Sequence, residues 1–170
     1  MPAIHVRDVD DDDFERIVAL NAMFVQETSA MGIARLSELH ALAFCHRVAV
    51  VDGEVAGFLL AMRDDAAYVN DNFDWFSARY PRFVYVDRIV VAAAAAGTGI
   101  GRRLYDDLFD RARQLGIGII ACEYNLEPPN PASRRFHDRF GFREVGRQHV
   151  ANGTKLVSLQ IAEVPDSDAR

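Results

Sequence analysis

Gly97-Thr98-Gly99-Ile100-Gly101 is the stretch of sequence on which the fold assignment depends. It follows a predicted strand over residues 83–91 and opens a predicted amphipathic helix over residues 100–115. Glycines let the backbone turn sharply, so several N–H groups can point at one anion near the start of a helix. The sequence therefore predicts a phosphate-binding turn. Arg102 and Arg103 either add positive charge to this turn or form the solvated face of the helix.

The residues before the turn predict a strand, two helices and a β-hairpin. Residues 3–7 form the strand, and the aspartates of residues 10–13 form a solvated cap on a helix with apolar positions Phe14, Ile17, Val18, Phe24 and Val25. A weaker helical pattern covers residues 36–44. Strand patterns over 47–51 and 54–62 flank Asp52-Gly53 and predict the hairpin. Residues 63–81 lose periodicity, so we expect a long loop with aromatic anchors.

The residues after the turn predict a central strand, a helix and a closing hairpin. Ile100, Leu104, Leu108, Ala112 and Leu115 form the inward face of the helix that opens at the turn, and a strongly apolar strand follows over residues 117–123. Asn130 and Pro131 predict an N-cap and a first helical residue, which open a helix that turns Ala132, Phe136 and Phe140 inward. Strands over 143–150 and 155–161 flank Asn152-Gly153. We expect one domain over residues 1–170, with a frayed tail at 164–170.

Composition excludes several classes of protein. The 170 residues are 50% hydrophobic, and the net charge of −6 disfavours a general nucleic-acid or anionic-membrane binder, which must neutralise phosphates. Cys45 and Cys122 stand outside any metal-binding spacing and are expected to be reduced, buried thiols. The longest uncharged run, residues 89–100, is shorter than the roughly 18 residues of a membrane span. We therefore expect a cytoplasmic protein with no membrane partner.

Three kinds of nucleotide-binding turn compete for the glycine-rich stretch. A Walker P-loop requires Lys and then Ser or Thr after its last glycine, and here Arg102 and Arg103 follow Gly101. A Rossmann turn would place Glu123 as the ribose-binding acid, but Arg102 stands where its third glycine or alanine belongs. An alanine-rich connector also separates the strand from Gly97, whereas a Rossmann turn is tight. The third kind is the turn of a family that further motifs of this sequence resemble, and it fits best.

Several separated motifs resemble, in order, the core motifs of the GNAT superfamily of acetyl-CoA-dependent N-acetyltransferases. They are the strand Val84-Tyr85-Val86-Asp87-Arg88-Ile89-Val90-Val91, the turn Gly99-Ile100-Gly101-Arg102-Arg103-Leu104, the strand to Glu123, and residues 132–142. The resemblance covers roughly residues 83–142. The stretch from Glu123 to Pro131 is similar to a poorly characterised subgroup of that family. Ala96 stands where the family usually has arginine or glutamine, so the resemblance implies a backbone cradle without that side chain.

The resemblance implies an α/β fold whose mixed, mainly antiparallel sheet has six to seven strands, splayed central strands and helices on both faces. It also implies acetyl-CoA as the co-substrate, with no metal, and direct transfer of the acetyl group to an amine in a ternary complex. The residues expected to hold the coenzyme are Ile89, Val90, Val91, Thr98, Gly99, Ile100, Gly101, Arg102, Arg103, Asn130, Ser133 and Phe136.

Catalysis requires a neutral amine, so a nearby base must accept a proton. Glu123, at the end of the predicted apolar strand, is the preferred candidate, and the alternative is a carboxylate paired with an arginine. Asp87 is the second candidate, with a structural ion pair to Arg88 as its alternative. His137 stands where the family often has a tyrosine that protonates the leaving thiolate. Its alternative is a half-exposed histidine packed beside Phe136.

The acceptor pocket is expected around Asn21, Phe73, Trp75 and Asn125, and it would take an amine of a small molecule or a peptide. Asn21 is either a pocket residue or a satisfied core amide. A homodimer is one possible assembly of this chain, and the sequence does not decide it. Two rival functions stay open as well: a non-catalytic acyl-CoA-binding or sensing module, and a dinucleotide-binding oxidoreductase domain.

Overall fold

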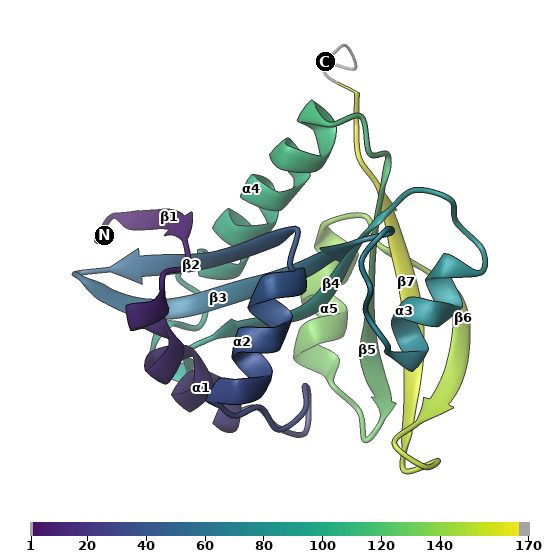
Figure 1. Ribbon diagram of the computed structural model, residues 1–170, viewed down its shortest axis with the longest axis horizontal. Helices are drawn as coiled ribbons and strands as arrows, with labels where there is room; N and C mark the ends of the chain where they lie inside the picture. Colours follow the sequence, from purple (N-terminus) through teal and green to yellow (C-terminus); the bar gives the residue numbers. More distant parts are fainter. Residues whose placement is uncertain (1, 167–170) are drawn as a thin grey trace. The chain divides into compact units, whose positions relative to one another are not determined.

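The computed structural model describes residues 2–166, which divide into two compact units. The first unit holds the chain up to Met62 together with Val86–Arg111, and the second holds Arg63–Tyr85 and the chain from Ala112 onward. Within these residues seven strands follow the order β1-β2-β3-β4-β5-β7-β6 in a mostly antiparallel sheet (Figure 1). The predicted fold class is confirmed. The single domain stays a prediction.

The strands of the first unit are held by regular antiparallel pairing. β1 (Ile4–Asp8) pairs with β2 (Cys45–Val51), which pairs with β3 (Glu54–Arg63). The predicted hairpin is confirmed, because Asp52 and Gly53 form its turn with φ of 51° and 82°. The later part of β4 (Val84–Val91) also belongs to this unit.

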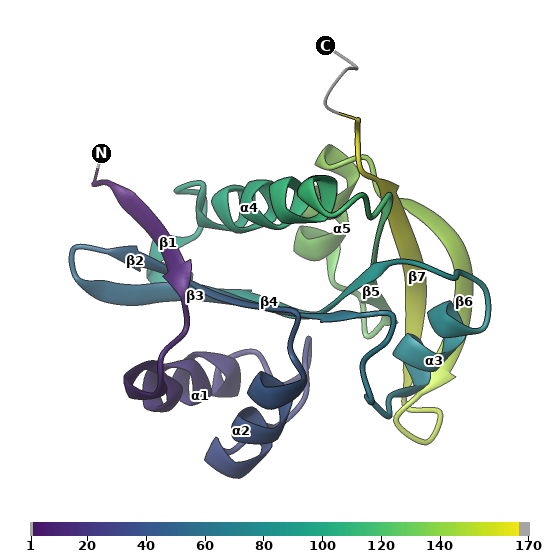
Figure 2. The ribbon, with the colours of Figure 1, turned by 45° about the horizontal axis from the view of Figure 1, so that its top comes forward.

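Helices cover both faces of the first unit (Figure 2). α1 (Phe14–Ala22) and α2 (Ile33–Leu42) lie on one face, and α4 (Ile100–Gln114) lies on the other. The inward face predicted for α4 is confirmed for the buried residues Ile100, Leu104, Leu108 and Ala112, whereas Leu115 lies beyond the helix and is exposed. The prediction of a longer first helix is wrong: α1 ends at Ala22, so Phe24 and Val25 lie after it.

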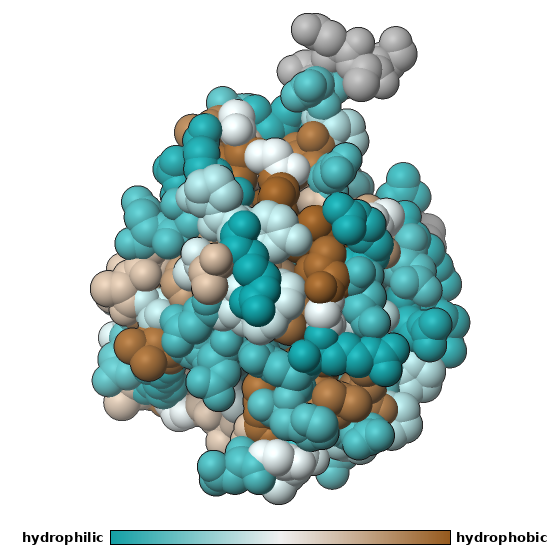
Figure 3. Space-filling view, turned by 90° about the vertical axis from the view of Figure 1, so that its right-hand side faces the viewer, coloured by the Kyte–Doolittle hydropathy of each residue, from teal (hydrophilic) through white to brown (hydrophobic). Residues whose placement is uncertain are grey.

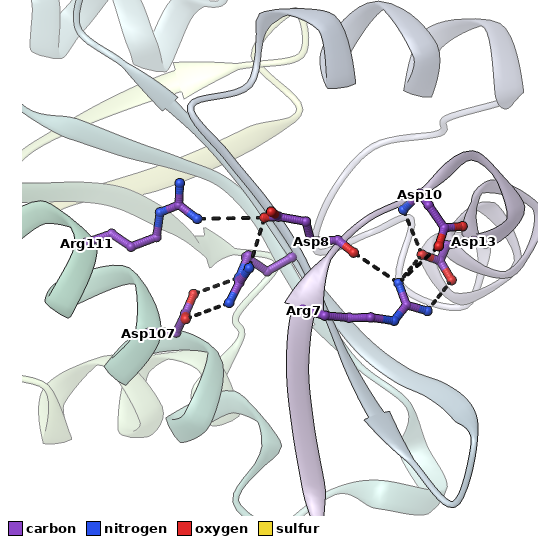
Figure 4. A network of polar contacts seen from close by, with 7 residues as sticks. Arg7, Asp8, Asp10, Asp13, Asp107 and Arg111 are labelled. Carbon is purple, nitrogen blue, oxygen red and sulfur yellow. Dashed lines mark hydrogen bonds and ion pairs between the residues drawn. The ribbon is translucent and has the colours of Figure 1, made fainter.

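The aspartate run before α1 carries more structure than a solvated cap. Asp10 and Asp13 form a reciprocal capping box around the short 3-10 helix η1 (Asp11–Asp13). Asp13 is buried and accepts hydrogen bonds from Arg7 at 2.7 and 2.9 Å, so it joins β1 to the helix start (Figure 4). Arg47 of β2 likewise bonds Asp107 of α4 at 2.9 and 3.0 Å. These ion pairs connect helices to strands on both faces.

The second unit is built on β5 (Ile119–Glu127), β7 (Lys155–Glu163) and β6 (Arg143–Val150), which pair antiparallel in that order. The closing hairpin is confirmed, and its turn contains Asn152 and Gly153 with positive φ. β5 runs to Glu127, whereas the sequence predicted an end at residue 123. In the described residues its parallel register with β4 comprises two pairs, Val84 with Ile120 and Tyr85 with Ala121.

Two helices accompany this second group of strands. α3 (Asp71–Ser77) contradicts the predicted loop over residues 63–81. Its Asn70 N-cap accepts hydrogen bonds from the amides of Asn72 and Phe73, and a helix of two turns is too short to show periodicity. α5 (Pro131–Arg139) begins as predicted, with Asn130 as its N-cap and Pro131 at its first position.

The inward face predicted for α5 is wrong. His137 is the buried residue of this helix, Ala132 is exposed, and Phe136 and Phe140 are half-buried. The helix therefore presents a different side to the strands from the one that its apolar residues suggested. Residues 167–170 of the predicted frayed tail lie outside the described residues. Between residues 2 and 166, no helix combines the length and the apolarity that crossing a bilayer requires.

Candidate active site

The glycine turn lies in the first unit, between β4 and α4. The 3-10 helix η2 (Ala93–Ala95) separates it from the strand. Gly97 and Gly99 have φ of 78° and 90°, a region that residues with a Cβ rarely adopt, and a Cβ built on either would meet open space. Glycine is therefore required here for backbone shape, and the turn stays open to solvent.

The amides of this turn divide into two groups. The amide of Thr98 donates to the carbonyl of Ala95 at 3.3 Å, and that of Arg103 donates to the carbonyl of Gly99 at 3.0 Å. The amides of Ile100, Gly101 and Arg102 form the first turn of α4, where an α-helix offers no carbonyl partner. Of the donors predicted over residues 98–103, the amides of Thr98 and Arg103 are thus engaged, which leaves that of Gly99 and these three at the positive end of the helix dipole.

Arg102 and Arg103 follow the turn with exposed side chains. Nε of Arg102 lies 3.7 Å from a carboxylate oxygen of Asp106, and the guanidinium of Arg103 donates to the carbonyl of Ile4 at 3.3 Å. Both arginines lie on the solvated side of α4, as one of the two predicted alternatives had it.

Gly57 of β3 is a residue of this region that the sequence analysis missed. A Cβ built on Gly57 would lie 2.8 Å from the carbonyl oxygen of Val90 and 3.0 Å from Cγ2 of Ile100. The missing side chain therefore lets β3 approach both the predicted coenzyme strand and the start of α4. The signal was present, since a glycine inside a strand often marks a close backbone approach.

Asp87 and Asn21 meet in a buried polar cluster around Arg88. Nε of Arg88 donates to Asp87 at 2.8 Å, and its terminal nitrogens donate to Asn21 Oδ1 at 3.1 Å and to Ser29 Oγ at 3.1 Å. Asn21 is fully buried and its amide nitrogen donates to the carbonyl of Ser29 at 2.8 Å. This geometry favours a core amide for Asn21 and a structural ion pair for Asp87. The cluster attaches the segment after α1 to β4.

Glu123 lies in the second unit and contacts Tyr85, a second residue that the sequence analysis missed. The Tyr85 hydroxyl lies 2.8 and 2.9 Å from the two carboxylate oxygens of Glu123, while its ring is fully buried. Glu123 is inside β5, four residues before its end, rather than at the strand end that was predicted. Because the hydroxyl donates to the carboxylate, Tyr85 fixes the carboxylate's position.

The predicted acceptor aromatics are placed around Tyr85 and β6. The Phe73 ring is buried, 5.8 Å from the ring of Tyr85. Trp75 is half-buried and packs on β6, where a Cβ built on Gly146 would lie 2.5 Å from the indole. The Arg79 guanidinium covers the indole 3.8 Å from its ring centre. Asn125 is buried within β5. The structure therefore brings Phe73 and Glu123 together through Tyr85.

His137 is buried among aromatic rings, including Tyr124 at 5.9 Å and Phe136 at 5.3 Å. Its Nδ1 lies 2.7 Å from the carbonyl oxygen of Ser133, so Nδ1 carries the ring proton, and it lies 3.2 Å from the Ser133 hydroxyl. Burial lowers the pKa of His137 below its ordinary value. A neutral imidazole whose proton is held by its own helix is poorly placed to protonate a leaving group. Of the alternative, the packing beside Phe136 is observed, whereas the half-exposed position is wrong because His137 is buried.

Metal binding finds no support in the described part of the chain, which contains no group of three or more metal-ligating side chains. Cys45 and Cys122 are buried and form no disulfide within the described residues, as expected. Burial raises the pKa of the Cys45 thiol to about 12, which makes it unreactive.

Comparisons of the sequence with known proteins point to one family. The sequence model of the acetyltransferase (GNAT) family matches residues 7–142. A phosphinothricin N-acetyltransferase of Streptomyces coelicolor is 46% identical over 59 residues, which are 34% of this chain and 33% of that protein. The chain thus matches about a third of that relative's length.

Solved structures share the fold over nearly the whole chain. Ard1 of Thermoplasma volcanium has a TM-score of 0.78 at 16% identity, covering 96% of this chain and 99% of that one. The putative acetyltransferase yncA of Salmonella typhimurium, solved with its cofactor acetyl-CoA, has a TM-score of 0.70 at 21% identity, covering 99% and 98%. At these identities the likeness shows the fold.

Proposed function

Because this chain belongs to the GNAT acetyltransferase family and is an N-acetyltransferase of that type, we propose that it transfers an acetyl group from acetyl-CoA to a primary amine. The amine nitrogen attacks the thioester carbonyl, the carbon–sulfur bond breaks, and coenzyme A leaves as a thiol. The acceptor is a small molecule or a peptide. The name of the Streptomyces coelicolor relative favours a small molecule.

The open glycine turn is the observation that carries the proposal. Three first-turn amides of α4, those of Ile100, Gly101 and Arg102, face no intrahelical carbonyl, and no side chain of Gly97 or Gly99 covers them. A diphosphate suits such a site, because it accepts several N–H bonds and its charge is favoured by the helix dipole. The backbone of Ile89 to Val91 would pair with the pantetheine as an added strand does.

Glu123 is the proposed base that removes the proton from the amine. The Tyr85 hydroxyl holds its carboxylate with a hydrogen bond and orients it, so Tyr85 acts as a positioning residue. Asp87 is already engaged by Arg88, which favours a structural role for it. His137 is left out of the proton transfers, since its ring proton is held by the Ser133 carbonyl.

Thiol release tests the proposal directly. The chain, incubated with acetyl-CoA and a panel of primary amines, is expected to release free thiol with at least one amine. The Glu123→Gln variant is expected to lose about a hundredfold or more of this rate, as removal of a general base does, and to bind coenzyme A with an unchanged Kd in calorimetry.

Other outcomes would favour the rival functions. Coenzyme A binding without thiol release for any amine would favour a non-catalytic acyl-CoA-binding module. NADH binding seen by fluorescence, with no affinity for coenzyme A, would favour an oxidoreductase domain and contradict the proposal.

A further inference from the structure

A cavity of about 260 Å³ lies in the second unit, lined by side chains of β5, α5, β6 and β7. Tyr124 of β5 and Gln160 of β7 line it, and both are buried. Neighbouring residues of a strand point to opposite faces of a sheet, so Tyr124 faces away from the side that holds the Glu123 carboxylate. Acetyl transfer from acetyl-CoA, as proposed above, gives this cavity no role.

The charged residues of the cavity carry a net positive charge. Three arginines, Arg134, Arg143 and Arg147, line it with two acids, Asp138 and Glu144, which gives 3 − 2 = +1. Nε of Arg147 donates to Glu144 at 3.0 Å, so these two charges are paired. Within residues 2–166, the side chains of Arg134 and Arg143 have neither a hydrogen bond nor an ion pair. Two guanidinium groups thus lie at the cavity with no hydrogen bond or ion pair to the described residues, although the charge of Arg134 also acts on Glu144.

Gln160, Tyr124 and Glu144 of the cavity are already joined to one another through hydrogen bonds. Gln160 donates to the Tyr124 hydroxyl at 3.2 Å and to the Ser158 hydroxyl at 2.7 Å. Ser158 in turn donates to Glu144 at 2.5 Å, and this bond holds the pKa of Glu144 below its usual value. Burial raises the pKa of Tyr124, so its hydroxyl stays neutral. Gln160 and Tyr124 are therefore neutral and held by hydrogen bonds, and the negative charges of the cavity are those of Asp138 and Glu144.

We propose that this cavity binds a small oxyanion, a carboxylate or a phosphate, through Arg134 and Arg143. A guanidinium offers a planar fork of N–H donors that matches both groups. Arg134 comes from α5 and Arg143 from the start of β6, so one anion can join the two elements. The volume is below the roughly 300–1,000 Å³ of pockets for larger ligands, which suits a small ion. Figure 3 shows that much of the side bearing β6 is hydrophilic and open to solvent.

Calorimetry with two separate probes tests this site. Inorganic phosphate and succinate are titrated into the full chain, alone and with coenzyme A at saturation, so that the glycine turn is filled in one of the two series. At least one anion is expected to bind with one-to-one stoichiometry in both series, and the comparison of the probes shows whether phosphate or carboxylate is preferred. Arg134→Gln and Arg143→Gln are each expected to weaken binding about tenfold, as loss of a charge-assisted hydrogen bond does.

Arg135→Gln is the matched control, because Arg135 is the next residue of α5, is exposed and does not line the cavity. It is expected to leave the Kd unchanged. Arg143→Lys keeps the charge without the fork and is expected to retain part of the affinity. Absence of binding by both anions, equal weakening by Arg134→Gln and Arg135→Gln, or loss of binding at saturating coenzyme A would each overturn the proposal. Melting temperatures establish that the variants are folded.

Discussion

A single hydroxyl group orients the proposed base. Tyr85 lies on β4, within the register that pairs this strand with β5, and its hydroxyl contacts both carboxylate oxygens of Glu123. Removing it in Tyr85→Phe leaves the buried ring in place but takes away a hydrogen bond to a charged group. We expect kcat to fall about tenfold, with KM for acetyl-CoA nearly unchanged. Steady-state kinetics measures both.

Tyr80→Phe is the control for this change, because the Tyr80 ring packs against Phe76 and its hydroxyl has no partner among residues 2–166. It is expected to leave kcat unchanged. Equal losses in the two variants, or a rise in KM alone, would contradict a positioning role for Tyr85. From the sequence alone, Glu123 could be predicted as the base. The hydrogen-bond donor that orients it, Tyr85, could not be identified, because it stands 38 residues earlier in the chain.

β3 can lie close to β4 and to the start of α4 because residue 57 is glycine. Its Cα faces the carbonyl of Val90 and the side chain of Ile100, so the start of α4 packs tightly against β3 and β4. Gly57→Ala would force these backbones apart. We expect a loss of about 1–3 kcal/mol in the free energy of unfolding, as overpacking causes, and a weaker coenzyme A complex because the first-turn amides shift. Urea unfolding and calorimetry measure these two quantities.

Gly118→Ala provides the control, since a Cβ at Gly118 would meet nothing within 4 Å and its φ is not positive. This variant is expected to unfold and to bind coenzyme A as the unchanged chain does. If Gly57→Ala kept full affinity for coenzyme A, the link between this contact and the glycine turn would be refuted.

The free energy of unfolding of the whole molecule is expected to fall in mild acid because of the histidine pair His40 and His46. Nδ1 of His46 lies 2.7 Å from Nδ1 of His40, and Nε2 of His46 is buried without a hydrogen-bond partner in the described residues. Burial, and then the neighbouring His40, lower the pKa of His46 from 6.5 to about 4. The unfolded chain therefore binds more protons between these two values, so the free energy of unfolding decreases as pH falls from about 6.5 to about 4.

The decrease due to His46 is at most about 3 kcal/mol, given 1.36 kcal/mol per pKa unit. Urea unfolding at a series of pH values measures it. Burial also lowers the pKa of His137, which adds to the decrease in the same direction. His46→Phe is expected to flatten in part the dependence of the free energy of unfolding on pH. The control His149→Gln, at an exposed histidine, is expected to leave that dependence unchanged. A profile that His46→Phe does not alter would contradict this prediction.

The sequence by itself determined the order of the strands and of every helix but α3, the two hairpins and the glycine turn. These features depend on local rules: glycines at positive φ, N-caps such as Asn130, and apolar residues at regular spacing. The predictions from the sequence were wrong where local rules are weak. Residues 71–77 form a helix too short to show periodicity, and the inward face of α5 centres on His137 because its fit among aromatic rings outweighs its polarity.

Only the tertiary structure decided which side chains meet. The contacts of Tyr85 with Glu123, of Arg88 with Asn21, and of Gly57 with Val90 join residues 33 to 67 positions apart, so no local pattern records them. Their distances depend on strand register and helix packing, which arise from the burial of the whole core. The same packing brings Arg134 and Arg143 to one cavity, and it buries His137, whose ring proton is held by the carbonyl of Ser133.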